Sequence, residues 1–134
     1  MAFELTKQIE KHLVNDAIAW LTTVTPSGRP APRPVWFLWG GSTITVYSQP
    51  NAAKLKHIAS NDQVSLHFNS TPGGGDVVVI SGRAEILSDE PLPSKLPALV
   101  AKYAGHIKAM GNTPEWYDSY NTSIRITPDR TWAF

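Results

Sequence analysis

The sequence of 134 residues contains no cysteine, which excludes a disulfide framework, a thiol nucleophile and a cysteine-ligated metal. It contains no apolar run near the roughly 20 residues that a membrane-spanning helix needs, and its N-terminus lacks the apolar core of a signal peptide. We therefore expect a cytoplasmic protein without a membrane span. With 42% hydrophobic and 17% charged residues, the chain suits one globular domain over residues 1–134.

A further absence is local, because residues 17–61 include no Asp or Glu although the whole chain has 11. The basic residues of this segment are Arg29, Arg33, Lys54 and Lys56. The segment is therefore positive in a protein whose net charge is only +1. A local positive patch favours a small anionic ligand over nucleic acid, which usually requires a basic domain or stripe.

One stretch of this segment predicts a strand, a turn and a short helix. The strand over 43–48 ends at Pro50, and Asn51 is expected to cap the helix that follows. Lys54 then lies in the first helical turn, where the dipole disfavours cations unless an anion is bound. A phosphate would satisfy Lys54 and Lys56, and each charge-assisted bond would contribute about 1.5–3 kcal/mol. The alternative is a solvated lysine pair on an exposed helix face.

Strand patterns joined by short turns occupy most of the chain. Besides 43–48, the β-forming runs are 18–25, 30–39, 64–69, 76–88, 122–127 and 131–134, the last two separated by a predicted turn at 128–130. Helical patterns are expected near the N-terminus to residue 15, and over 52–60, 98–107 and 114–120. Six or seven strands with a few inserted helices predict a mainly β fold, an antiparallel barrel with peripheral helices.

The segment 30–39 combines three prolines with two tryptophans. Pro30, Pro32 and Pro34 recur at every second residue, so their missing N–H groups point one way, as an edge strand allows. The continuation over 35–39 has large apolar side chains on both faces. Such a strand needs cover on both sides, and a flat aromatic ligand or a second subunit would provide it.

Other candidate positions are few. Gly82 interrupts the strand pattern over 76–88 and predicts a bulge or a close backbone approach. The four histidines lack metal-binding spacing, and no catalytic triad is visible, so we assign no metal ligand and no catalytic residue. His12 is expected to be a surface or boundary side chain of the N-terminal helix.

Over residues 16–127 the sequence resembles the pyridoxamine 5′-phosphate oxidase-like flavoproteins. The motifs that carry the resemblance are Arg33-Pro-Val-Trp-Phe, Val46-Tyr-Ser with Ala-Lys54-Leu-Lys-His-Ile, Asn61-Asp-Gln-Val-Ser-Leu, and Gly82-Arg-Ala-Glu85. The resemblance implies an FMN-binding-like split β-barrel of six or seven antiparallel strands. It also implies a homodimer that holds an isoalloxazine or deazaflavin ring at the subunit interface.

The resemblance implies a set of cofactor-binding positions. Lys54 matches the phosphate-binding lysine after the third barrel strand, and Arg33 matches the arginine that opens the R-x-V strand. The other positions expected at the cofactor are Val35, Trp36, Phe37, Tyr47, Ser48 and Lys56. Glu115, Tyr117, Tyr120 and Arg125 are candidates for the substrate end from the partner subunit, or else ordinary helix-surface and strand-exposed side chains.

The sequence also departs from the vitamin B6 oxidases, which continue R-x-V-L-L-K where this chain has Leu38 and which carry a long basic C-terminal tail. The compact form, with Lys54-x-Lys56-His57, looks more like the branch that uses the deazaflavin coenzyme F420. The resemblance thus implies an F420-dependent oxidoreductase that transfers a hydride between the reduced cofactor and a small organic acceptor. An FMN-binding reductase of the same fold is one alternative, and a non-catalytic protein that binds flavin, haem or another tetrapyrrole is the other. A nucleic-acid-binding barrel is disfavoured because the aromatic residues cluster with apolar neighbours.

Overall fold

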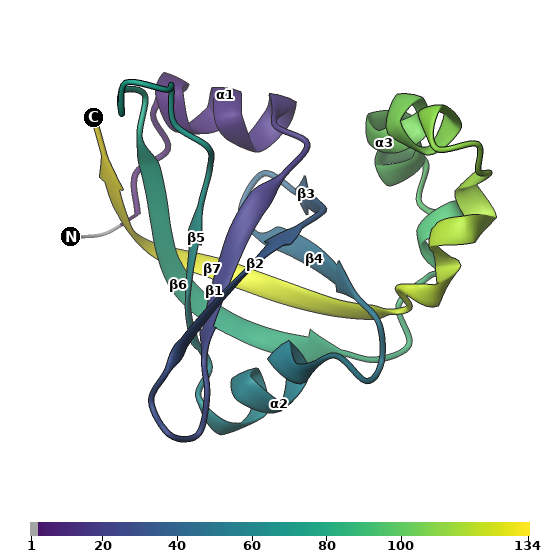
Figure 1. Cartoon of the computed structure of the whole chain (residues 1–134), viewed down its shortest axis with the longest axis horizontal. Helices are drawn as coiled ribbons and strands as arrows, with labels where there is room; N and C mark the ends of the chain where they lie inside the picture. The colour runs from purple at the N-terminus through teal and green to yellow at the C-terminus, as the bar shows by residue number, and fades with distance from the viewer. Residues whose placement is uncertain (1–2) are drawn as a thin grey trace.

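The strands form a single antiparallel sheet in the order β2-β1-β5-β6-β7-β4-β3 (Figure 1). The computed structural model describes residues 3–134. Its strands are β1 Ala19–Val24, β2 Pro30–Val35, β3 Phe37–Trp39, β4 Ile44–Ser48, β5 Gln63–His67, β6 Val78–Leu87 and β7 Thr122–Ala133. These seven strands within the described residues confirm the expected mainly β, antiparallel fold.

The two outermost strands of the sheet are consecutive in the chain and are separated by Trp36 alone. β2 pairs with β1 at one end of the sheet, and β3 pairs with β4 at the other. Because one residue spans at most about 3.6 Å, the two ends must approach each other at Trp36, and the sheet curls into a half-barrel. The prediction of one strand over 30–39 is wrong at this residue, whereas the predicted edge position of the proline-rich part is confirmed.

Gly82 lies at an irregularity in the pairing of β6 with β7, as the sequence predicted. Gly82 pairs with Pro128, and the register shift beside this pair leaves Asp129 as the additional residue of β7. A Cβ atom on Gly82 would lie 2.4 Å from the carbonyl oxygen of Thr127, so only glycine fits. The predicted turn at 128–130 is wrong, because this bulge accommodates Pro128 within one continuous strand.

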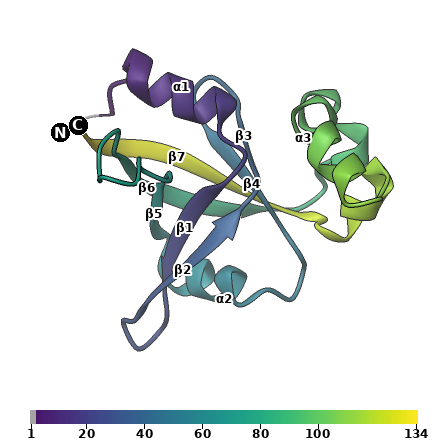
Figure 2. The same cartoon turned by 45° about the horizontal axis from the view of Figure 1, so that its top comes forward.

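The helices lie at the ends and at one side of the sheet (Figure 1). They are α1 Lys7–Asn15, α2 Ala53–Ser60, η1 Pro93–Lys95, α3 Pro97–Ala109 and η2 Pro114–Ser119. α1 covers one end of the curled sheet and α2 covers the other, whereas α3 stands apart from both in the two views (Figure 1, Figure 2). Among residues 3–134, no helix combines the length and the apolar character needed to cross a membrane.

The starts of α1 and α2 differ in their capping. The Thr6 hydroxyl accepts a hydrogen bond from the Ile9 N–H at 3.2 Å and so caps α1. α2 begins after Ala52, which makes no side-chain cap. The prediction that Asn51 caps this helix is therefore wrong, and the first N–H groups of α2 lack a side-chain partner.

Two apolar clusters hold the elements together. The larger fills the inside of the curled sheet, and the smaller packs α3 and η2 against β4. The smaller cluster consists of Tyr47, Leu99, Tyr103, Ile107 and Tyr117, with Trp36 packed against it. The connection from β6 to β7 is thereby fixed beside the point where the sheet curls closed.

Tyr103 provides the polar attachment between α3 and the sheet. Its hydroxyl accepts a hydrogen bond from the Phe37 N–H at 2.9 Å. The same oxygen lies within donating distance of the carbonyl oxygens of Ala17, at 2.8 Å, and Phe37, at 3.1 Å. The backbone next to Trp36 is therefore held by a side chain of α3.

Candidate functional site

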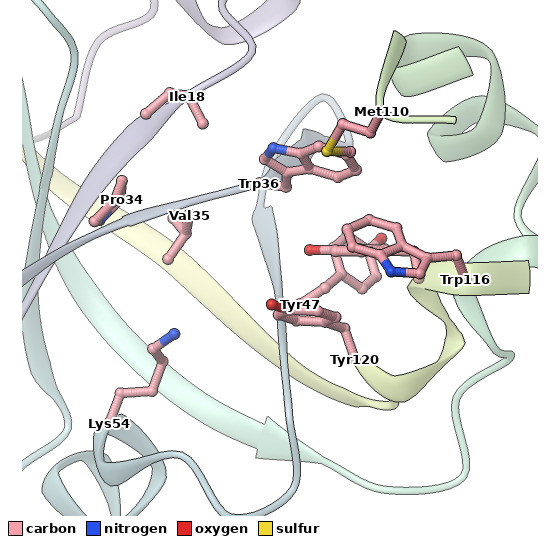
Figure 3. Close-up of a pocket in the computed structure, with 10 residues that line it drawn as sticks. Ile18, Pro34, Val35, Trp36, Tyr47, Lys54, Met110, Trp116 and Tyr120 are labelled. Carbon is pink, nitrogen blue, oxygen red and sulfur yellow. The ribbon is translucent and has the colours of Figure 1, made fainter. Parts of the chain in front are cut away.

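Two pockets of about 290 Å³ each meet at Lys54. The first, which we call the aromatic pocket, is lined by Ile18, Pro34, Val35, Trp36, Tyr47, Lys54, Met110, Trp116, Tyr117 and Tyr120 (Figure 3). The second, the cationic pocket, is lined by Thr23, Ala31, Arg33, Pro34, Ala52, Ala53, Lys54, His57 and Tyr120. Because Pro34, Lys54 and Tyr120 line both, the two pockets lie next to each other.

Stacked rings make one wall of the aromatic pocket rigid. The Trp36 indole stacks on the Tyr103 ring with centroids 4.1 Å apart and planes 5° apart, and it contacts the Tyr117 ring at 4.7 Å. The Tyr117 ring in turn stacks on Tyr120 at 4.4 Å and 15°. Lys54 extends from α2 with its ammonium group toward the space that Trp116 and Tyr120 bound on the opposite side (Figure 3). A flat conjugated ring is the ligand shape that such walls favour.

Lys54 is a half-buried cation with no anionic partner among residues 3–134. Burial lowers its pKa from the ordinary value, and the positive charge of Arg33 lowers it further. Neither pocket is lined by an Asp or Glu. A bound anion would offset both effects, because it would restore a counter-charge to two neighbouring cations.

The start of α2 adds hydrogen-bond donors to the cationic pocket. The first turn contains no acidic residue, and the Leu55 N–H is satisfied by the Ala52 carbonyl at 3.1 Å. The N–H groups of Ala53 and Lys54 precede any possible intrahelical acceptor, so they are free for a ligand. His57 Nδ1 lies 2.8 Å from the Thr23 hydroxyl, which fixes the position of α2 against β1.

The structure brings some of the predicted cofactor-binding positions together and not others. Those that line a pocket are Arg33, Val35, Trp36, Tyr47 and Lys54. Phe37 is fully buried in the larger apolar cluster, because successive residues point to opposite sides of the backbone. Ser48 is also buried, with its hydroxyl donating to the Gln49 carbonyl at 2.9 Å. Lys56 is exposed and lines neither pocket, since two residues along a helix turn the side chain by about 200°.

Of the four candidates for the substrate end, two line a pocket and two do not. Tyr117 and Tyr120 line the aromatic pocket from within the same chain, whereas Glu115 lines neither pocket. Arg125 instead lies 3.5 Å from Glu85 and 3.6 Å from Glu90 on the sheet surface.

Sequence reasoning missed four of the residues that line the aromatic pocket, Ile18, Pro34, Met110 and Trp116. Ile18 precedes β1, and Met110 ends α3, so both come from element boundaries. Trp116 was visible as an aromatic residue next to Tyr117. No local pattern indicates that the 34 residues between β6 and β7 return to the Trp36 side of the sheet.

Comparison with known proteins identifies the family. The family model described as pyridoxamine 5′-phosphate oxidase matches residues 5–133. Comparison with curated protein sequences gives no match.

Several solved structures share the fold. A candidate pyridoxamine 5′-phosphate oxidase from Listeria innocua has a TM-score of 0.69 at 23% identity, covering 98% of each chain. An F420 reductase has a TM-score of 0.64 at 21% identity, covering 91% of this chain and 94% of that one. The haem storage protein HutZ from Vibrio cholerae has a TM-score of 0.64 at 17% identity, covering 98% and 95%. The TM-scores and coverage establish a shared fold.

Proposed function

The chain belongs to the pyridoxamine 5′-phosphate oxidase family, and from this premise we propose that it is an oxidoreductase that uses the deazaflavin coenzyme F420. The observation that carries the proposal is the junction of the aromatic and cationic pockets at Lys54. A phosphorylated redox cofactor has the same two parts, a flat ring and an anionic tail. The reduced ring would supply a hydride to the electron-poor carbon of a small organic acceptor.

The residues of the cationic pocket fit an anionic tail. Lys54 and Arg33 would neutralise the phosphate, and the free N–H groups at the start of α2 would donate hydrogen bonds to its oxygens. Because the ammonium group of Lys54 is already partly desolvated, it loses little further hydration when the anion binds. Lys56, two residues further along α2, is exposed and lines neither pocket.

The residues of the aromatic pocket fit the ring. Val35 and Trp36 would lie along one face of it, and the stacked Tyr117 and Tyr120 rings would bound its edge. These side chains would orient the ring and exclude water from it. The absence of Asp and Glu from the pocket lining keeps negative charge away from a transferring hydride.

F420 is preferred over FMN for two reasons. Leu38 stands where the vitamin B6 oxidases have a lysine, and it packs against the smaller apolar cluster, as Trp36 does. An F420 reductase also shares the fold over 91% of the chain. FMN binding to the same residues is the second candidate, since the cationic pocket accepts any phosphate monoester or diester.

A homodimer is part of the proposal. Met110 and Trp116 line the aromatic pocket yet keep 49% and 43% of their surface exposed. A second copy laid over the pocket mouth would cover these side chains and complete the ring site. Sedimentation of the purified protein tests this point directly.

The proposal is tested by titrating the protein with F420 and with FMN while following tryptophan and cofactor fluorescence. Lys54→Ala should weaken F420 binding about 10- to 100-fold, because one charge-assisted bond contributes about 1.5–3 kcal/mol. Lys56→Ala is the matched control, two residues away on the same helix and outside both pockets, and should change the affinity less than about threefold.

Each result of the titration has a defined meaning. Binding of FMN alone would replace the F420 proposal by the FMN reductase. Binding of neither would overturn both. A Soret band on haem addition, with no cofactor binding, would indicate a haem-binding protein instead, as HutZ is.

A further inference from the structure

The Tyr117 hydroxyl has no hydrogen-bond partner among residues 3–134, although the residue is only 5% exposed. Tyr103, in the same apolar cluster, shows the usual arrangement: its hydroxyl accepts from the Phe37 N–H and lies within donating distance of two carbonyl oxygens. Buried tyrosine hydroxyls are normally paired in this way, and an unpaired buried polar group costs about 1–3 kcal/mol. Tyr117 is therefore an exception that needs an explanation.

The position of Tyr117 supplies one. The residue lines the aromatic pocket, and its hydroxyl oxygen is not among the fully enclosed polar atoms of the described residues, so it keeps some open surface. Its ring is held by Trp36 at 4.7 Å and by Tyr120 at 4.4 Å. The hydroxyl is thus presented to a ligand by a ring that cannot turn away.

The chemistry of the group defines what it would bind. Burial raises the pKa of Tyr117 far above its ordinary value, and the neighbouring Tyr120, Tyr103 and Tyr47 raise it further. The phenol stays protonated at every physiological pH, so it has an O–H to donate to an acceptor atom of a ligand. The stacked walls select a flat ring, and a conjugated carbonyl is the acceptor that lies in the plane of such a ring.

We propose that Tyr117 is a specificity-determining residue whose hydroxyl donates a hydrogen bond to a carbonyl oxygen of a planar, conjugated ring bound in the aromatic pocket. Two sources offer this carbonyl, the cofactor ring itself or a quinone or enone substrate. The cofactor source rests on the proposed function, whereas the substrate source does not. Either way the hydrogen bond stabilises negative charge on the carbonyl oxygen.

The experiment pairs one variant with ligands that differ in a carbonyl. Tyr117→Phe removes the hydroxyl and keeps the ring, and no intramolecular hydrogen bond is lost. The quinone menadione and its carbonyl-free counterpart 2-methylnaphthalene are each titrated by quenching of tryptophan fluorescence, since Trp36 and Trp116 line the pocket. F420 is titrated in the same way. No turnover is needed for the readout.

Tyr117→Phe should weaken the binding of a carbonyl ligand about 3- to 10-fold, as one neutral hydrogen bond predicts, and leave 2-methylnaphthalene within about twofold. A loss confined to F420 assigns the carbonyl to the cofactor, and a loss confined to menadione assigns it to the substrate. Equal affinities of both proteins for menadione and for F420 would overturn the inference. If Lys54→Ala still weakened F420 binding as expected, the proposed function would stand without this inference.

Discussion

His12 Nε2 lies 3.0 Å from Oδ1 of Asp76, so an imidazole of α1 is joined to the residue that leads into β6. The other ring nitrogen, Nδ1, lies 2.6 Å from Asp16 Oδ2, and the ring stacks on Phe68 at 5.1 Å. A neutral imidazole carries one N–H, whereas each nitrogen here faces a carboxylate. The arrangement therefore favours the doubly protonated, charged ring.

The contacts of His12 with Asp16 and Asp76 predict that the stability of the protein depends on pH. Burial alone lowers the pKa of His12, but the hydrogen bonds and charges of Asp16 and Asp76 outweigh burial and raise it. A raised folded pKa means that the stabilisation is complete below the unfolded value, about 6.5, and is lost as the pH rises through the folded value. Urea unfolding between pH 5.5 and 8.5 should show wild type losing its advantage over His12→Gln as the pH rises. Parallel stability curves for the two proteins would contradict this.

Tyr103 and Tyr117, two of the three buried tyrosines of the smaller apolar cluster, should respond differently to loss of the hydroxyl. Tyr103→Phe leaves the buried Phe37 N–H unpaired and should lower the free energy of unfolding by about 1–3 kcal/mol. Tyr117→Phe removes no internal hydrogen bond and should change it by less than about 0.5 kcal/mol. Chemical unfolding of both variants checks the comparison, and equal losses would show that the Tyr117 hydroxyl has an internal partner.

Gly82 should not tolerate a side chain. Gly82→Ala places a Cβ where the Thr127 carbonyl oxygen already lies, so β6 and β7 must separate, at a cost of about 1–3 kcal/mol. Gly105→Ala is the matched control, because Gly105 is an exposed helical residue with nothing within 4 Å of the added atom. That change should raise stability by about 0.5–1 kcal/mol. Thermal melting of the two variants should shift in opposite directions.

Lys54 should reduce the stability of the ligand-free protein. It is a half-buried cation beside Arg33, and both burial and that charge disfavour its protonated form. Lys54→Met keeps the packing and removes the charge, so it should raise the free energy of unfolding by a few tenths to about 1 kcal/mol. Inorganic phosphate should raise the melting temperature of wild type and not of the variant. A variant that is less stable and still protected by phosphate would show that the anion binds elsewhere.

Much of the fold was accessible from the sequence because its signals were local. The alternation of apolar residues gave the strands, and the proline spacing over 30–34 gave an edge strand, as found. Gly82 was readable because a lone glycine in a β-forming run usually marks a bulge. The turn expected at Pro128 was wrong because the register of a partner strand decides whether a proline interrupts a strand, and one sequence does not contain that register.

The candidate site was accessible in part for a similar reason. Lys54 could be placed by helix electrostatics and by resemblance, and it does line both pockets. Phe37 was expected beside the ring by resemblance, but it is buried in the larger apolar cluster. The strand break at Trp36 sets which way these side chains face, and that break depends on contacts distant in sequence. His12 was expected at the surface or boundary, yet it is 7% exposed, because Asp76 and Phe68 approach it from another part of the chain.

The single residue between β2 and β3 has a thermodynamic consequence. A ligand pressed against the Trp36 indole would hold the backbone at both ends of the sheet, although these two strands form no ladder with each other. Amide hydrogen exchange should then slow in both strands together when the aromatic pocket is occupied. Opening of the half-barrel and release of the ligand would be one linked equilibrium. Any substitution that loosens the approach of β2 and β3 at Trp36 should therefore also weaken binding.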